Sequence, residues 1–176
     1  MSVIALTAAV LLASQTSIPA PRYGEADVVR LESCVFGGDD MAKCGDFSAE
    51  VDALQTCAAA ANLGEGPEGF ADQWSKCDFV LPCQLEKPEP DQTTMALRNC
   101  SARGVAASKI LAGRWITELS PRLQALLDEE RKGMLADLEM PAGSDEPLRA
   151  SAHWSGSWTA YLQFLRFVQL TSKAAP

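Results

Sequence analysis

Apolar side chains recur every three or four residues in several parts of the chain, which is the spacing of one face of an α-helix. The first clear case predicts a helix over 46–62, because Asp46 is a residue type that caps helices and an apolar stripe follows it. The residues of this stripe are Phe47, Val51, Leu54, Cys57 and Ala58.

Helix-breaking residues divide the rest of the chain. Glycines and a proline in 64–67 predict a turn, and three prolines make 81–91 a loop and a subdomain boundary. Asp91 is expected to cap a long helix, and Ser120 followed by Pro121 is the order that begins another. The helices expected after the turn cover 68–76, 91–119, 120–139 and 147–171. No segment alternates apolar and polar residues as a β-strand does, so we predict an all-α bundle of about five to six helices.

Two of the long helices carry stripes that are expected to face the core. In the 91–119 helix, the middle of the stripe consists of small residues, which lets another helix approach closely. The residues of this stripe are Leu97, Cys100, Gly104, Ala107, Leu111 and Trp115. The last helix is apolar nearly all round: Trp154, Trp158, Tyr161, Phe164, Leu165, Phe167, Val168 and Leu170. Such a helix is central to a core, or, where exposed, is a partner or dimer surface. We expect Trp158 and Gly104 to be buried on facing or neighbouring helices.

The six cysteines predict three disulfides and therefore a disulfide-stapled bundle. An even number of cysteines in a short chain behind an export-like leader is typical of an oxidising compartment. A metal site is not expected, since no C-x-x-C occurs and His153 is the one histidine. Six cysteines allow fifteen pairings. The simplest joins sequence neighbours, as Cys34–Cys44, Cys57–Cys77 and Cys83–Cys100.

The N-terminus resembles an export signal. Residues 4–13 form an uncharged apolar run of signal-peptide length, too short to span a bilayer, although no basic residue precedes it and Pro21 follows Ala20. We expect a signal peptide over 1–20 and a periplasmic or secreted protein; the alternative is an N-terminal core helix. The remainder divides into a Cys-rich acidic helical subdomain, 21–91, and a three-helix region, 92–176.

Charge is unevenly distributed along the chain. The formal charge of -8 excludes a typical nucleic-acid binder, which needs a basic face. Residues 24–91 contain fifteen Asp and Glu against four Lys and Arg, whereas residues 92–176 contain eight against ten. Either the two parts pack together and partly neutralise each other, or the first presents an acidic surface that steers a basic partner.

Residue patterns for catalysis are missing from the sequence. It has no G-x-S-x-G, P-loop, G-x-G-x-x-G or H-E-x-x-H motif, and His153 stands beside Trp154 without one. Asp128, Glu129 and Glu130 are consecutive, so on a helix they do not face one site and are expected to form a solvated acidic face. We therefore expect no catalytic residue, no metal ligand and no cofactor.

Over about residues 92–168 the chain resembles the lysozyme-inhibitor LprI-like family of bacterial exported helical domains. The family pattern is a cysteine followed by A-D-x-x-L-N-x-x-Y on one helix, and W-x-x-Y-R-D-x-x-C on a later one. The positions that match are Cys100, Ala107, Leu111, Trp115 (for the aromatic Tyr), Trp158 and Tyr161. The family's polar residues fall at Ser108, Ala112, Leu162 and Gln163, and its closing cysteine at Arg166, so Cys100 must pair upstream.

This resemblance implies an all-helical periplasmic domain and, for some members, inhibition of lysozyme. Two functions are therefore expected. The first is an exported, non-catalytic binding protein of the lysozyme-inhibitor type that docks on a basic partner. The alternative is a structural or accessory envelope module that contacts another protein through the aromatic C-terminal helix. Without a catalytic motif, a hydrolase ranks third.

Overall fold

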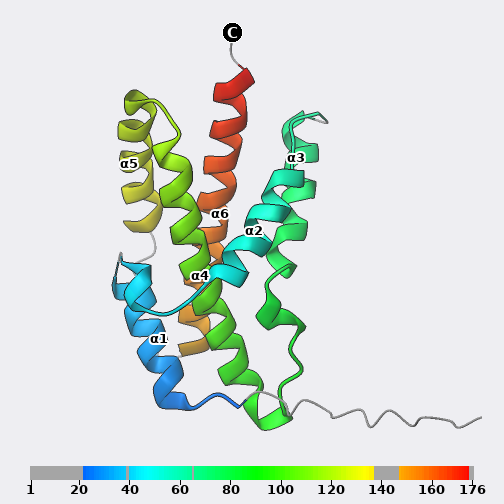
Figure 1. Ribbon diagram of the computed structural model, residues 1–176, viewed down its shortest axis with the longest axis vertical. Coiled ribbons are helices and arrows are strands. Elements are labelled where there is room, and N and C mark those ends of the chain that lie inside the picture. Colours follow the sequence, from blue (N-terminus) through cyan, green and yellow to red (C-terminus); the bar gives the residue numbers. More distant parts are fainter. Residues whose placement is uncertain (1–21, 39, 65, 137–146, 175–176) are drawn as a thin grey trace, which may run out of the picture.

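The computed structural model describes residues 22–38, 40–64, 66–136 and 147–174, which are helical and contain no strand (Figure 1). The α-helices of this part are α1 Glu25–Gly37, α2 Ser48–Ala60, α3 Gly66–Ser75, α4 Thr93–Thr117, α5 Pro121–Ala136 and α6 Pro147–Ala174. Short 3-10 turns lie at η1 Met41–Lys43, η2 Lys76–Phe79, η3 Pro82–Leu85 and η4 Pro90–Gln92. The predicted all-α bundle is confirmed, while the expected signal peptide lies outside the described residues.

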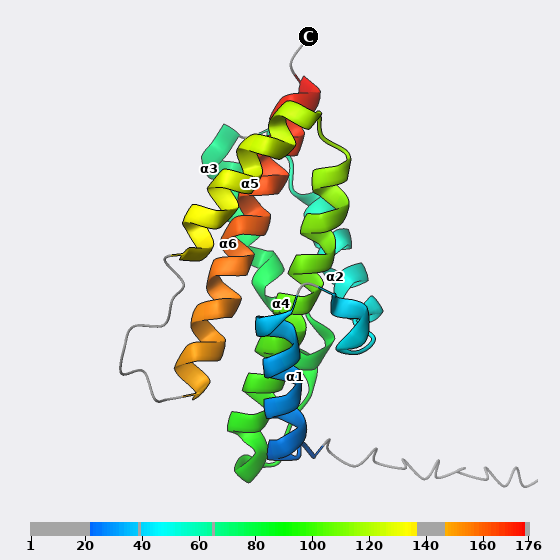
Figure 2. The same ribbon diagram turned by 90° about the vertical axis from the view of Figure 1, so that its left-hand side faces the viewer.

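Helix α4 is the centre of the bundle. It packs most extensively against α6, and also contacts α1 and α2 (Figures 1 and 2). Its middle consists of small residues that are completely buried, among them Ala102, Val105 and Ala106, so neighbouring helices approach its backbone closely. One core joins the regions 21–91 and 92–176, since Val51 and Phe70 belong to the same apolar cluster as Leu111 and Leu165.

The expected packing stripes lie at the core with two exceptions, Leu97 of α4 and Phe164 of α6, which is 37% exposed. Trp158 and Gly104 are both buried, and a Cβ at Gly104 would lie 3.0 Å from Leu81 Cδ1 and 4.0 Å from Ser155 Oγ of α6. Leu97 is 52% exposed and borders a groove.

Three helix starts differ from the prediction, and one is that of α3, which begins at Gly66 instead of residue 68. The Asp46 carboxylate does accept a hydrogen bond from the Ser48 N–H at 2.9 Å, but α2 begins only at Ser48. Asp91 does not cap α4, because Pro90 starts the turn η4 and places Asp91 inside it. Ser120 does precede α5 as expected, and its Oγ accepts from the Leu123 N–H at 3.5 Å.

Helix α1 was not predicted at all. Its buried residues are Val28, Glu32 and Val35, so a glutamate occupies the middle of what would be an apolar stripe. Local periodicity cannot identify that position as part of the core, because the burial of Glu32 depends on an arginine of α4.

Candidate functional site

Three disulfides bind the short N-terminal elements into one frame. Cys34–Cys44 joins α1 to the end of η1, Cys57–Cys77 joins α2 to η2, and Cys83–Cys100 joins η3 to α4. These are the pairs that sequence proximity predicts, and no cysteine is left as a thiol. Cys100 pairs upstream, with Cys83.

Two ion pairs connect the acidic first part to α4. Arg98 donates to both carboxylate oxygens of Glu32, from Nε at 3.0 Å and from Nη2 at 2.5 Å, and the pair is buried. Arg103 forms the same fork with Glu50, at 2.5 and 2.9 Å. The hydrogen bond to Glu32 raises the pKa of Arg98, and the one to Glu50 raises that of Arg103. Part of the charge asymmetry is therefore neutralised inside the fold.

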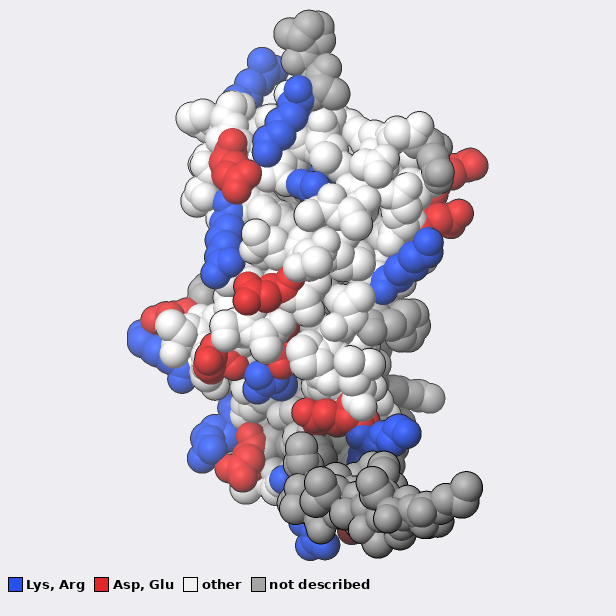
Figure 3. Space-filling view, turned by 45° about the vertical axis from the view of Figure 1, so that its right-hand side comes forward, with Lys and Arg blue, Asp and Glu red and all other residues white. Residues whose placement is uncertain are grey.

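The other acidic side chains that the structure describes in the first part lie on its surface. Among its described residues the exposed carboxylates are Glu25, Asp27, Asp40, Asp46, Asp52, Glu68, Asp72, Glu86, Glu89 and Asp91. The exposed bases there are Arg30, Lys43, Lys76 and Lys87. On the face in Figure 3, however, Lys and Arg are interspersed with Asp and Glu around a broad uncharged area. That face therefore carries charges of both signs and is not an acidic patch.

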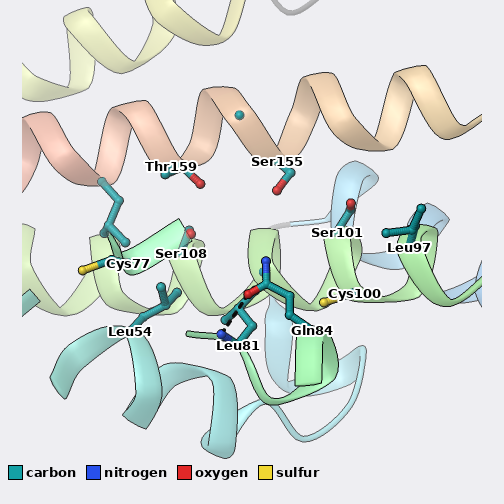
Figure 4. Close-up of a pocket in the computed structure, with 13 residues that line it drawn as sticks. Leu54, Cys77, Leu81, Gln84, Leu97, Cys100, Ser101, Ser108, Ser155 and Thr159 are labelled. Atoms are coloured by element: carbon teal, nitrogen blue, oxygen red, sulfur yellow. Dashed lines mark hydrogen bonds between the residues drawn. The ribbon is translucent and has the colours of Figure 1, made fainter. Parts of the chain in front are cut away.

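A groove of about 270 Å³ lies between α4, α6 and the segment that leads into η3 (Figure 4). Its apolar lining is Leu54, Leu81, Leu97, Leu162 and the disulfide-bonded Cys77 and Cys100. Its polar lining is Gln84, Ser101, Ser108, Ser155 and Thr159, and Gly104 and Gly156 complete it. Figure 4 shows Ser155 and Thr159 projecting from α6 toward α4. Small residues on both long helices thus leave space beside their contact.

The hydroxyls of the groove are not used by the fold. Gln84 Oε1 accepts from the Leu81 N–H at 3.1 Å, whereas the serine and threonine side chains of the lining make no hydrogen bond within the described part of the chain. A hydroxyl can donate one hydrogen bond and accept others, so the groove offers several polar contacts to a ligand. None of its described lining residues is titratable, so they supply no general acid or base.

The residues singled out in the sequence occupy other places. Of the family-like anchors, Ala107, Leu111 and Trp115 are buried in the core and Cys100 borders the groove, while Trp158 and Tyr161 border a second pocket. His153 is exposed and does not line the groove.

Neither the acidic run of α5 nor a metal cluster forms a site in the described residues. The run of three acidic residues in α5 is exposed, with Asp128 3.4 Å from Arg131 and Glu129 2.8 Å from Lys132. No group of three or more His, Cys, Asp or Glu that could hold a metal occurs in the parts of the chain that the structure describes.

Sequence reasoning missed the groove hydroxyls. Ser101 and Ser108 are seven residues apart, and Ser155 and Thr159 are four apart, so each pair lies on one helix face. Nothing in the sequence shows that the two faces meet.

Comparisons with protein-family models, curated proteins and solved structures found no match. Within the described residues, none of the helices combines the length and apolarity that a membrane crossing requires.

Proposed function

We propose that the chain is an exported, non-catalytic binding protein whose ligand occupies the groove between α4 and α6. The observation that carries this proposal is a groove lined by leucines and by hydroxyls that have no hydrogen-bond partner among the described residues. Apolar pockets with a few convergent polar groups are the usual form of small-molecule sites. Such a lining favours binding over catalysis, because a serine without a neighbouring base is a weak nucleophile.

The ligand is a small uncharged molecule with an apolar part. An ion in the groove would lose its hydration without meeting an opposite charge among the described lining residues, which is costly. A neutral ligand instead exchanges hydrogen bonds with the hydroxyls while its apolar part contacts Leu81 and Leu162.

The disulfides support this role in two ways. Cys57–Cys77 and Cys83–Cys100 each place one cysteine in the lining, so the groove is held in shape before the ligand arrives and less ordering is needed on binding. Disulfides also persist mainly in oxidising compartments, which supports export to the periplasm or the medium.

A substitution at Gly156 tests whether the ligand occupies the groove. It is an exposed residue of α6 that lines the groove, and a Cβ there would meet no atom within 4 Å. Gly156→Leu should fill the groove and, by replacing a helical glycine, stabilise the helix by up to about 1 kcal/mol. Gly133→Leu in α5 is the matched control, since Gly133 is also exposed with no atom near its Cβ but is absent from the lining.

The probes are hexyl glucoside, hexyl phosphate and hexylamine, titrated calorimetrically into the oxidised chain. We expect the parent and Gly133→Leu to bind the neutral glucoside best, and Gly156→Leu to lose at least about tenfold in affinity, or about 1.4 kcal/mol. Equal affinity of the two leucine variants, or a preference of the parent for either charged probe, would contradict the proposal.

Docking on a basic protein such as lysozyme is the second candidate. It is supported by the family resemblance and by the excess of exposed carboxylates over bases in residues 24–91. Attraction between exposed charges decays over about 8 Å at physiological ionic strength, so inhibition should weaken with salt. Lysis of a peptidoglycan suspension by a c-type lysozyme is the assay, and an unrelated acidic protein of equal charge is the control. Inhibition no stronger than the control's would remove this candidate.

The alternative function, an envelope module, requires an exposed apolar surface on α6. Phe164 is 37% exposed and lies with Phe70 and Phe167 at a shallow apolar site between α3 and α6. Trp158, by contrast, is buried and is not part of this surface. If the module self-associates through this site, sedimentation should show a concentration-dependent oligomer that Phe164→Ser abolishes; a monomer at all concentrations would exclude self-association.

A further inference from the structure

A second pocket, of about 290 Å³, lies between α4, α5 and α6. Its described lining consists of Lys109, Ala112, Gly113, Ile116, Arg131, Trp158 and Tyr161. None of these residues belongs to the groove lining, so the two spaces use different faces of α4 and α6.

Two hydrogen-bond donors at this pocket are buried without an acceptor. Tyr161 is 0% exposed and Trp158 is 5% exposed, and neither the Tyr161 hydroxyl nor Trp158 Nε1 has a hydrogen-bond partner in the described parts of the chain. Most buried polar groups in proteins are hydrogen-bonded, since leaving one unpaired is costly. The two rings are in edge-to-face contact, with centroids 5.7 Å apart, and both residues line this pocket.

Two basic side chains border the pocket. Arg131 and Lys109 line it, Arg131 Nη2 lies 3.4 Å from Asp128 Oδ1 in α5, and no Asp or Glu is among the described lining residues. Lys109 Nζ lies 5.4 Å from the centroid of the Trp158 ring and also donates to the carbonyls of Val35 and Gly38. Burial raises the pKa of Tyr161, so its hydroxyl keeps its proton at neutral pH and remains a donor.

We propose that this pocket binds a small organic carboxylate, which accepts hydrogen bonds from Tyr161 and Trp158 close to the guanidinium of Arg131. A carboxylate has two acceptor oxygens for the two donors, and its charge complements the guanidinium of Arg131. Ala112, Ile116 and the aromatic rings provide an apolar surface for the rest of the molecule. This site is independent of the groove ligand proposed above.

The experiment follows the indole N–H resonances of the oxidised, ¹⁵N-labelled chain during titration with benzoate. The chain has four tryptophans, and the spectrum of Trp158→Phe assigns the signal of Trp158. We expect benzoate to shift that signal saturably and the other three much less, and benzamide, its neutral isostere, to have little effect. Inorganic phosphate distinguishes a general anion site from one that needs an organic carboxylate.

The variant Tyr161→Phe tests whether the Tyr161 hydroxyl contacts the ligand or is only an unpaired group in the core. In both cases the variant should be at least as stable as the parent, because it removes an unpaired buried group. Only a ligand contact makes it lose benzoate affinity, by about tenfold or more. Gly113→Leu, an exposed position with an open Cβ site at this pocket, should also lose benzoate, whereas Gly133→Leu should not.

Three outcomes would overturn the proposal. The first is no shift of Trp158 with benzoate, which would mean that the pocket holds internal water only. The second is undiminished affinity in Tyr161→Phe. The third is equal binding of benzamide or of phosphate.

Discussion

The two parts of the chain reach stability by different routes. The first, from α1 to η4, consists of helices of 13, 13 and 10 residues and short 3-10 turns, with five cysteines that form two internal disulfides and one to α4. The second consists of helices of 25, 16 and 28 residues, and its one cysteine joins it to the first. Short helices are marginal in water, so the first part relies on covalent links. The long helices α4 and α6 of the second part instead bury apolar stripes against each other.

The same comparison accounts for the buried ion pairs between the two parts. Glu32 of α1 and Glu50 of α2 pair with arginines of α4, and Ser151 of α6 donates a further hydrogen bond to Glu32 at 2.5 Å. The short helices are therefore oriented on α4 by polar contacts as well as by disulfides. We expect the polar contacts and the disulfides to contribute unequally to the free energy of unfolding.

The largest effect is expected at the buried ion pair. Arg98→Met leaves Glu32 as an uncompensated buried charge and should lower the free energy of unfolding by about 3–5 kcal/mol, measured by urea denaturation. Arg30→Met is the control, because the Arg30–Asp27 pair is exposed and is expected to contribute at most about 1 kcal/mol. Similar midpoints for the two variants would show that the pair does not orient α1.

Loss of a disulfide is expected to have the second-largest effect on the free energy of unfolding. Replacing both Cys57 and Cys77 by serine should cost about 2–5 kcal/mol, because the unfolded chain regains the freedom of a 20-residue separation. Hydrogen exchange should increase most in α2 and α3 and least in α6. Uniform acceleration in all helices would contradict the idea that the first part alone depends on its disulfides. Alkylation of the unreduced parent should label no cysteine.

A smaller effect is expected where the two parts touch. A side chain at Gly104 of α4 would meet Leu81 Cδ1 at 3.0 Å, so Gly104→Leu should overpack this contact and cost about 1–3 kcal/mol, read from thermal unfolding. Gly133→Leu again serves as the control. An unchanged melting temperature for Gly104→Leu would mean that the η3 segment moves away from α4 without cost.

The sequence alone predicts those features that are encoded locally. Five α-helices and their breakers follow from nearby residues, such as Pro121 at the start of α5, and the even number of cysteines predicts three disulfides. The sequence does not decide among the fifteen possible pairings, and the structure has the pairing of sequence neighbours. Helix α1 could not be found, because Glu32 stands at a core position where its partners, Arg98 and Ser151, come from distant helices. The groove was equally hidden, since its lining comes from α2, η2, η3, α4 and α6. Tyr161 was recognised as an anchor, but its unpaired hydroxyl depends on the surrounding helices.

The position of a ligand in the groove tests the central claim most directly. Nuclear Overhauser effects should be recorded between hexyl glucoside and the methyl groups of the oxidised chain. We predict contacts with Leu81 and Leu162, which line the groove, and none with Ile116, which lines the second pocket. Contacts confined to Ile116 or to surface methyl groups such as those of Leu126, or no contact at all, would contradict the assignment of the groove as the binding site.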